Sequence, residues 1–163
     1  WDVRNAQPGV FTCYDEAQLI ADITAAKQTC DDVFVSVHWG TEHTDTLTNY
    51  QQKMAHEFVD AGADAVIGSH PHVLQSMEYY NGKPIFYSLG NFIFNQDIAQ
   101  TTAVQIHVSA DNTSSVTLLP ATASNATTSE ATAEQAASIY QYLNSISPTA
   151  HIDESGKVTQ IVQ

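Results

Sequence analysis

Three histidines stand where two predicted strands end. His38 closes the apolar run 32–38. His70 and His72 follow the apolar run 64–68 and are separated from each other by one proline. Neutral imidazole binds Zn, Mn, Fe and related ions, so three such rings brought to one place would form a metal site. A single histidine at a strand end has a simpler explanation, because it is usually solvated or hydrogen-bonded.

The segment between these two runs predicts how the histidines meet. Residues 48–61 carry apolar side chains at helical spacing, so the stretch 33–68 is expected to form a strand, a helix and a strand. Strands joined by one crossover helix are parallel, and their carboxyl ends share one edge of the sheet. Neighbouring strands lie about 4.8 Å apart, so the three imidazoles can reach one ion or a close pair. The proline is expected to hold His70 in an extended conformation.

Three further polar residues are candidates for the same site. Glu42 and His43 follow His38 in a loop rich in Thr, and Asn91 follows a glycine in the segment 88–92. Glu42 is placed to orient a metal ligand, His43 to line the site, and Asn91 to donate its amide to an anion. Each also has a plain alternative: a surface acid, a solvated loop histidine, and ordinary Gly-Asn turn chemistry.

The rest of the chain predicts a mixed α/β fold in one domain over residues 1–163. Helices are expected over 15–29 and around 137–143, and hairpins over 75–88, 103–119 and 151–163. The stretch 121–131 contains only small, polar or acidic residues and is predicted to be an exposed loop or linker. The two cysteines, Cys13 and Cys30, flank a predicted helix and are therefore expected not to form a disulfide with each other.

Composition and charge limit the class of partner. The chain has 163 residues, and 5 Lys and Arg against 18 Asp and Glu give a formal net charge of −13. Nucleic acid and anionic lipid both require clustered cations, so neither is expected as a partner. No apolar run approaches the roughly 20 residues of a membrane span. The first five residues also lack the pattern of a signal peptide.

Three ordered blocks carry a family resemblance. They are His38-Trp39-Gly40-Thr41-Glu42, the stretch 61–75 that contains Gly68-Ser69-His70-Pro71-His72, and Tyr87-Ser88-Leu89-Gly90-Asn91-Phe92. Together they resemble the bacterial capsule synthesis proteins of the CapA type, which are associated with poly-γ-glutamate. Those proteins are similar in fold to calcineurin-like metallophosphoesterases. The resemblance is close over 33–95 and implies the C-terminal part of a four-layer αββα sandwich with metals at one sheet edge.

The resemblance also implies roles for the histidines. His38 and His70 would serve one divalent metal and His72 a second, the ions being Mn, Fe or Zn. The superfamily takes its other ligands from earlier Asp, His and Asn residues, which would precede residue 1. A missing N-terminal half or another chain is therefore expected to complete the site. The sequence departs from the family pattern at Ser69, where a further His is more common, and at His43, where Tyr is.

Three functions follow from this resemblance as expectations. The first is biosynthesis or processing of a capsule polymer, poly-γ-glutamate, by an extracytoplasmic protein with a metal-dependent hydrolase-type site. Its partner would be an anionic polymer. The second is a non-catalytic scaffold or binding domain that retains the metallophosphoesterase fold. The third is hydrolysis of small phosphoesters or nucleotides, which rests on fold analogy alone.

Overall fold

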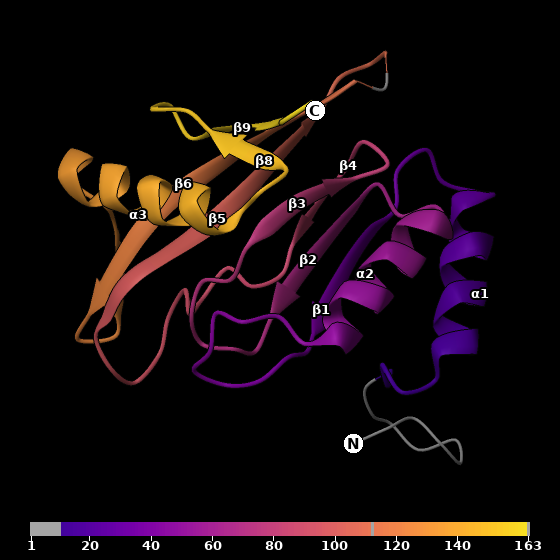
Figure 1. Cartoon of the computed structure of the whole chain (residues 1–163), viewed down its shortest axis with the longest axis horizontal. Coiled ribbons are helices and arrows are strands. Elements are labelled where there is room, and N and C mark those ends of the chain that lie inside the picture. The colour runs from indigo at the N-terminus through magenta and orange to yellow at the C-terminus, as the bar shows by residue number, and fades with distance from the viewer. Residues whose placement is uncertain (1–10, 112, 163) are drawn as a thin grey trace.

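Two β-sheets and three helices make up the described part of the chain, which comprises residues 11–111 and 113–162 of a computed structural model (Figure 1). The helices are α1 (Glu16–Lys27), α2 (Asn49–Asp60) and α3 (Ala133–Ile146). The strands are β1 (Phe34–His38), β2 (Ala65–Ser69), β3 (Met77–Tyr80), β4 (Lys83–Phe86), β5 (Ile98–Val108), β6 (Ser114–Ser124), β7 (Thr127–Glu130), β8 (Ala150–Ile152) and β9 (Lys157–Gln160). The predicted α/β class is confirmed. The residues on which the signal-peptide prediction rests lie outside the described part.

The predicted crossover is present. β1 and β2 pair in parallel, with His38 opposite Ser69, and α2 connects them. A capping box formed by Thr48 and Gln51 starts α2, because each side chain satisfies a backbone N–H that the helix leaves unpaired. The helix then buries the face that includes Phe58 against the sheet. This crossover fixes the edge of the sheet at which the candidate site lies.

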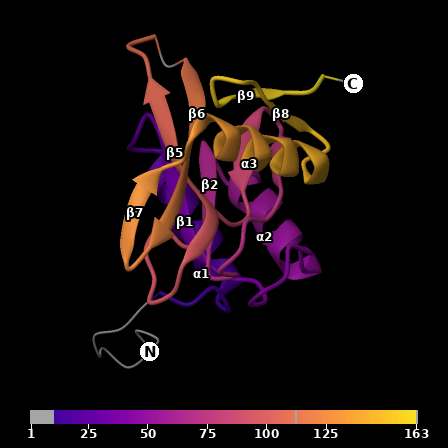
Figure 2. The ribbon, with the colours of Figure 1, turned by 90° about the vertical axis from the view of Figure 1, so that its left-hand side faces the viewer.

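The two sheets pack face to face as part of an α/β sandwich. The first sheet has the order β1-β2-β4-β3, and the second has the order β5-β6-β9-β8, with β7 paired to β6. One face of the first sheet carries α1 and α2, and its other face shares a core with the second sheet and α3. In Figure 2 the second sheet and α3 face the viewer, with α1 and α2 behind them. Among the described residues, no helix combines the length and the apolar character that crossing a membrane requires.

The prediction of an exposed loop over 121–131 is wrong. These residues form the end of β6 and all of β7, which pair in antiparallel fashion from Ala121 opposite Glu130 to Ser124 opposite Thr127. Ala121 and Ala123 are buried, which follows the two-residue alternation of a strand. The Ala, Ser, Asn and Glu residues that dominate this stretch have little strand preference of their own, so the pairing of β6 with β5 on its other edge decides the conformation here. The other predicted helices and hairpins are confirmed, and both cysteines are free.

Asp64 ties α1 to the first sheet. Its carboxylate accepts hydrogen bonds from Lys27 Nζ at 2.7 Å, Lys83 Nζ at 2.8 Å and the Val33 N–H at 2.9 Å. Its side chain is 12% exposed. Burial alone would raise the pKa of Asp64, but these three hydrogen bonds outweigh it and hold the pKa below its ordinary value.

Asp64→Asn should destabilise the fold in a pH-dependent way. The folded pKa is depressed, so the stabilisation is complete above the unfolded pKa of about 3.9 and is lost as the pH falls through the folded pKa. We expect urea unfolding at pH 7 to show a loss of about 2–3 kcal/mol. The difference in the free energy of unfolding between this variant and the wild type should become smaller below about pH 4. Asp22→Asn, at an exposed position on α1, is the control and should change the free energy of unfolding by less than about 0.5 kcal/mol. An Asp64→Asn loss that is independent of pH would contradict this account.

Candidate metal centre

The parallel pairing of β1 and β2 brings the predicted histidines to one place. His38 is the last residue of β1, and the turn that carries His70 and His72 follows β2 directly. The ring centroids of His38 and His70 lie 4.5 Å apart, and those of His70 and His72 lie 5.8 Å apart. His43, from the loop after β1, stacks on His72 with a centroid distance of 5.7 Å. Four imidazoles from two loops therefore form one cluster at the carboxyl edge of the first sheet.

Glu42 lies among the donor atoms of this cluster. One ligand atom each from Glu42, His70 and His72 lie within 4.8 Å of one another. The sequence predicts that Glu42 orients a ligand, whereas the structure places its carboxylate where it can bind the ion itself. His38 adjoins this group through His70. Two imidazole nitrogens and one carboxylate oxygen form a donor set that fits Zn, Mn or Fe.

Hydrogen bonds from neighbouring side chains orient two of the rings. His72 Nδ1 lies 2.8 Å from Asn91 Oδ1, and His38 Nδ1 lies 3.3 Å from Ser69 Oγ. An amide oxygen only accepts, so His72 donates from Nδ1 and keeps the lone pair on Nε2 free. A metal-binding histidine commonly has such a partner on its other nitrogen. The sequence predicts Asn91 as an amide donor to an anion, whereas its carbonyl oxygen is the group that contacts His72.

The surroundings of His38 favour its neutral form. Burial lowers the pKa of His38, and the neighbouring His70 and His72 lower it further because like charges repel. A neutral ring is the form that binds a metal ion, so no proton has to be displaced from His38 near neutral pH.

Three residues of the cluster have left-handed backbone conformations. The φ angles are 58° at His43, 105° at His70 and 63° at His72. The prediction of an extended His70 is therefore wrong. Pro71 disfavours a helical conformation before it, but the chain must reverse immediately after β2, and the turn takes a positive φ instead. Positive φ is costly for residues with a Cβ, and such strain gathers at functional sites.

Hydrogen bonds hold the two loops of the cluster together. The His43 N–H donates to Pro71 O at 2.8 Å, and the Trp39 N–H donates to Ser69 O at 3.0 Å. Beneath them, Gln51 Nε2 donates to Gln75 Oε1 at 2.8 Å.

The side chains of both glutamines are buried, and they anchor the loop that carries Glu42. Gln75 Nε2 donates to the Thr44 carbonyl at 3.0 Å, and the Gln51 side chain caps α2. Sequence analysis does not single out Gln51 or Gln75. The one feature that could have drawn attention to them is an uncharged polar residue among apolar residues, in a helix for Gln51 and just before a strand for Gln75.

Phe94 contacts the cluster, whereas two of the other histidines lie away from it. The Phe94 ring lies 5.0 Å from the His72 ring and forms an apolar wall for it. His56 lies outside the cluster, where it pairs with Glu78 at 2.5 Å. His107 is exposed on β5. The cluster thus uses four of the seven histidines in the sequence.

Comparison with known sequences identifies the family. Residues 1–96 match the family described as bacterial capsule synthesis protein PGA_cap. The chain belongs to this family. It is 41% identical over 116 residues to the PGA biosynthesis protein CapA of Bacillus subtilis (strain 168), and 39% identical over 121 residues to the capsule biosynthesis protein CapA of Bacillus anthracis. It is 34% identical over 99 residues to a probable polyglutamine synthesis accessory protein of Mycobacterium tuberculosis (strain CDC 1551 / Oshkosh).

The chain matches only part of each relative. The alignment with the B. subtilis protein covers 69% of this chain and 30% of that protein. The alignment with the B. anthracis protein covers 70% of this chain and 29% of that protein, and the alignment with the M. tuberculosis protein covers 57% of this chain and 26% of that protein. The chain thus aligns with less than a third of each of these proteins. Activities and partners of the whole proteins therefore belong to proposals about this chain.

The positive φ at His70 predicts that a glycine variant is more stable than an alanine variant at this position. His70→Gly removes the Cβ that opposes the positive φ, whereas His70→Ala keeps it. We expect His70→Gly to be more stable than His70→Ala by about 1 kcal/mol, measured by urea unfolding in the presence of a chelator. The matched pair His56→Gly and His56→Ala, inside α2, should show the opposite order by a similar amount. If the two His70 variants were equally stable, this backbone would not be strained.

Proposed function

We propose that this chain supplies a divalent-metal centre to a protein that synthesises or processes a capsule polymer, with a hydrolase-type site. The observation that carries the proposal is the convergence of Glu42, His70 and His72 donor atoms within 4.8 Å at the carboxyl ends of the parallel strands β1 and β2. Open α/β sheets place ligands at this edge. Family membership supports the role in capsule synthesis, since relatives are named for poly-γ-glutamate (PGA) and capsule biosynthesis.

Each residue of the cluster has a distinct part in this proposal. His70, His72 and Glu42 bind the ion, and three protein ligands leave a position for water or substrate. A bound divalent ion lowers the pKa of its water and polarises a substrate oxygen. Asn91 holds His72 in the tautomer that binds through Nε2. His38, kept neutral beside His70, is available as a further ligand or to accept a proton.

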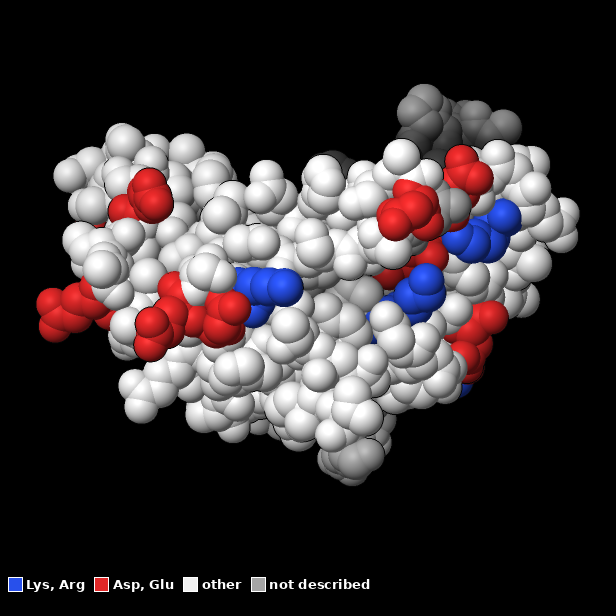
Figure 3. All heavy atoms as spheres, turned by 90° about the horizontal axis from the view of Figure 1, so that it is seen from above, with Lys and Arg blue, Asp and Glu red and all other residues white. Residues whose placement is uncertain are grey.

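Electrostatics support a cation between the protein and an anionic polymer. The formal net charge of −13 repels poly-γ-glutamate over the surface as a whole. On the face shown in Figure 3, basic groups are scattered and lie beside acidic ones. A metal ion at the histidine cluster would provide a positive point at which a carboxylate or phosphate of the polymer binds. The capsule role of the relatives supports an extracytoplasmic location.

A non-catalytic scaffold is the second candidate, and one observation favours it. Within residues 11–111 and 113–162, Glu42, His70 and His72 form the one group of three or more metal-binding side chains. A pair of metals, as in calcineurin-like enzymes, would need ligands from a missing N-terminal half or from another chain. Without them the chain would retain the fold and bind at most one ion.

Metal titration tests the centre directly. Calorimetry on chelator-treated protein should show binding of Zn, Mn or Fe(II), and His72→Ala and Glu42→Gln should each weaken it by at least about 100-fold because each removes a ligand. His107→Ala, at an exposed position on β5, is the matched control and should bind as the wild type does. If the wild type bound no metal, or if neither His72→Ala nor Glu42→Gln weakened binding, the proposed centre would be contradicted.

Activity assays separate the enzyme from the scaffold. We expect the metal-loaded protein to shorten poly-γ-glutamate in a chelator-sensitive way, and the Glu42→Gln variant to lose this activity. Metal binding without any turnover would favour the scaffold. Chelator-sensitive hydrolysis of an aryl phosphate, with the polymer left intact, would favour the small-phosphoester hydrolase that the resemblance also allows.

A further inference from the structure

The second sheet and α3 lie beyond the family match. The match ends at residue 96, and β5 is the first element after it. Glu42, Asn91 and the four histidines of the cluster all precede that point. Any effect of the second sheet and α3 on the candidate site therefore acts through the loops that carry these residues.

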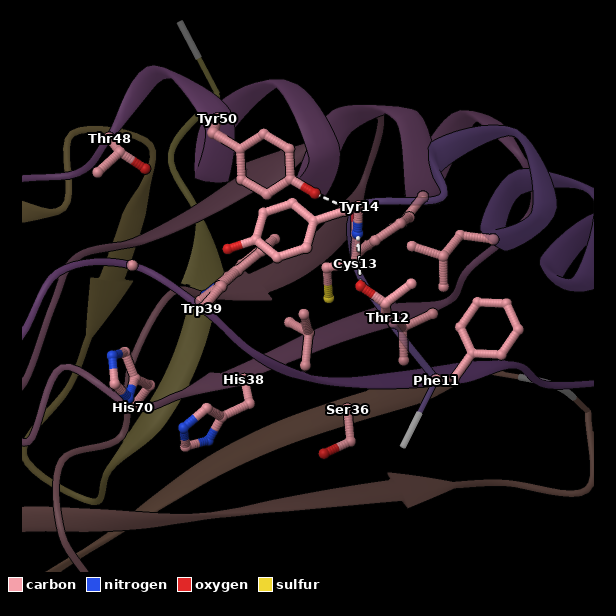
Figure 4. Close-up of a pocket in the computed structure, with 15 residues that line it drawn as sticks. Phe11, Thr12, Cys13, Tyr14, Ser36, His38, Trp39, Thr48, Tyr50 and His70 are labelled. Atoms are coloured by element: carbon pink, nitrogen blue, oxygen red, sulfur yellow. Dashed lines mark hydrogen bonds between the residues drawn. The ribbon is translucent and has the colours of Figure 1, made fainter. Parts of the chain in front are cut away.

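The loop that carries Glu42 is fixed at both of its ends. In Figure 4, Trp39 and Thr48 mark these two ends. The Trp39 N–H donates to Ser69 O at 3.0 Å, and the Thr48 side chain caps α2. Glu42 lies between these points and is exposed. The position of its carboxylate therefore depends on the contacts that the middle of the loop makes.

α3 makes one of these contacts. The Tyr142 hydroxyl donates to Asp45 Oδ2 at 3.0 Å, three residues after Glu42. Burial and the adjacent Asp45 carboxylate raise the pKa of Tyr142 to about 12. The hydroxyl therefore keeps the proton that it donates throughout the physiological pH range, and the bond to the loop persists there.

The turn of α3 that carries Tyr142 is itself fixed to the second sheet. Ile139 and Leu143 are buried in the core that α3 shares with this sheet. The side chain of Asn144 donates to the Ile152 carbonyl at 2.9 Å and accepts from the Ile152 N–H at 2.8 Å. Because α3 is held on both counts, its bond to Asp45 restrains the loop rather than the helix.

The second sheet also holds the loop that carries Asn91. Thr101 Oγ1, on β5, donates to Leu89 O at 2.8 Å. Thr128 Oγ1, on β7, donates to Phe92 O. These two carbonyls flank Asn91 in the chain, so β5 and β7 restrain it from both sides.

We infer that β5–β9 and α3 form a clamp that raises the metal affinity of the site from outside its ligand set. The inference rests on the proposed function, because it takes Glu42 as a ligand and Asn91 as the partner of His72. Tyr142 is a positioning residue that acts through the Glu42 loop, and Thr128 is one that acts through Asn91. A group that is restrained before the ion binds loses less conformational freedom on binding, so removal of either bond weakens binding.

A purely structural role is the alternative to a clamp. The second sheet and α3 contribute many buried residues to the core, so a lost hydrogen bond there could lower only the free energy of unfolding. A clamp instead changes the metal affinity of molecules that are already folded. Metal binding and unfolding are therefore measured on the same variants.

Zinc titration of the whole chain is the first test. We expect Tyr142→Phe and Thr128→Val each to weaken Zn binding by about 3–10-fold in calorimetry, because each loses one hydrogen bond to a loop of the site. Tyr79→Phe and Thr159→Val are the matched controls. Each loses a hydroxyl that donates to a carbonyl away from both loops, and each should bind Zn as the wild type does.

Combined variants show through which residue each bond acts. In a Glu42→Gln background, Tyr142→Phe should change Zn affinity by less than about 2-fold, because the loop no longer supplies its ligand. In an Asn91→Ala background, Thr128→Val should likewise have little further effect. The crossed combinations, Tyr142→Phe with Asn91→Ala and Thr128→Val with Glu42→Gln, should keep the full effect. A purely structural role would give the same effect in every background.

Hydrogen exchange tests the restraint without a metal. The His43 amide donates to Pro71 O at 2.8 Å, so its exchange reports opening of the Glu42 loop. In chelator-treated protein, Tyr142→Phe should speed this exchange by at least about 3-fold, and Tyr79→Phe should leave it unchanged. Urea unfolding establishes that each variant is folded. If Tyr142→Phe does not fold, Asp45→Ala removes the same bond from the exposed side and takes its place in both backgrounds.

Three results would overturn the clamp while leaving the metal centre in place. They are Zn binding by both single variants that equals the wild type, controls that weaken binding as much as they do, and effects that persist unchanged in the Glu42→Gln and Asn91→Ala backgrounds. Unchanged exchange of the His43 amide would overturn the part of α3. If the wild type bound no metal, the centre and the clamp would both be overturned.

Discussion

The close approach of three strands at Gly68 is the constraint on which the candidate site depends. A Cβ at this position would lie 2.1 Å from Tyr87 O and 2.5 Å from Trp39 Nε1. The space is used by a hydrogen bond of 2.9 Å from the Trp39 indole to the Tyr87 carbonyl. This bond passes over β2 and connects the end of β1 to the end of β4. It therefore fixes, in one place, the starting points of the loops that carry Glu42, His70 and Asn91.

The site is built on rigid elements but is formed by strained turns. Stacking of Trp39 on Phe58 and Tyr87 secures the sheet edge below the cluster, with ring centroids 6.2 and 5.9 Å apart. Above it, His43, His70 and His72 have positive φ. Strain of this kind persists only where surrounding structure over-determines it. Here the hydrogen bonds between the two loops and the buried amides of Gln51 and Gln75 beneath them hold these residues in the strained conformation.

Local patterns were sufficient to predict the elements that place the histidines. The helical spacing of residues 48–61 and the short apolar runs on either side predict the crossover, and the crossover predicts that His38 and His70 meet. The conformation of 121–131 depends on pairing with distant residues, so composition gave the wrong answer there. The position of the Glu42 carboxylate depends on how the ten-residue connection between β1 and α2 closes, which no local spacing encodes. The same is true of Gln75, whose partners Gln51 and Thr44 are distant in sequence.

The buried glutamine pair has a consequence for how the site responds to acid. Gln51 and Gln75 carry amides, which have no ionisable form, so the anchor of the Glu42 loop is the same at every ordinary pH. A proton and a metal ion compete for the same imidazole nitrogen, so the affinity of any imidazole site for a metal ion depends on pH. For an ion held as proposed, acid would weaken binding while the hydrogen bonds of Gln51 and Gln75 keep the Glu42 loop in place, so rebinding at neutral pH would need no rearrangement of this loop.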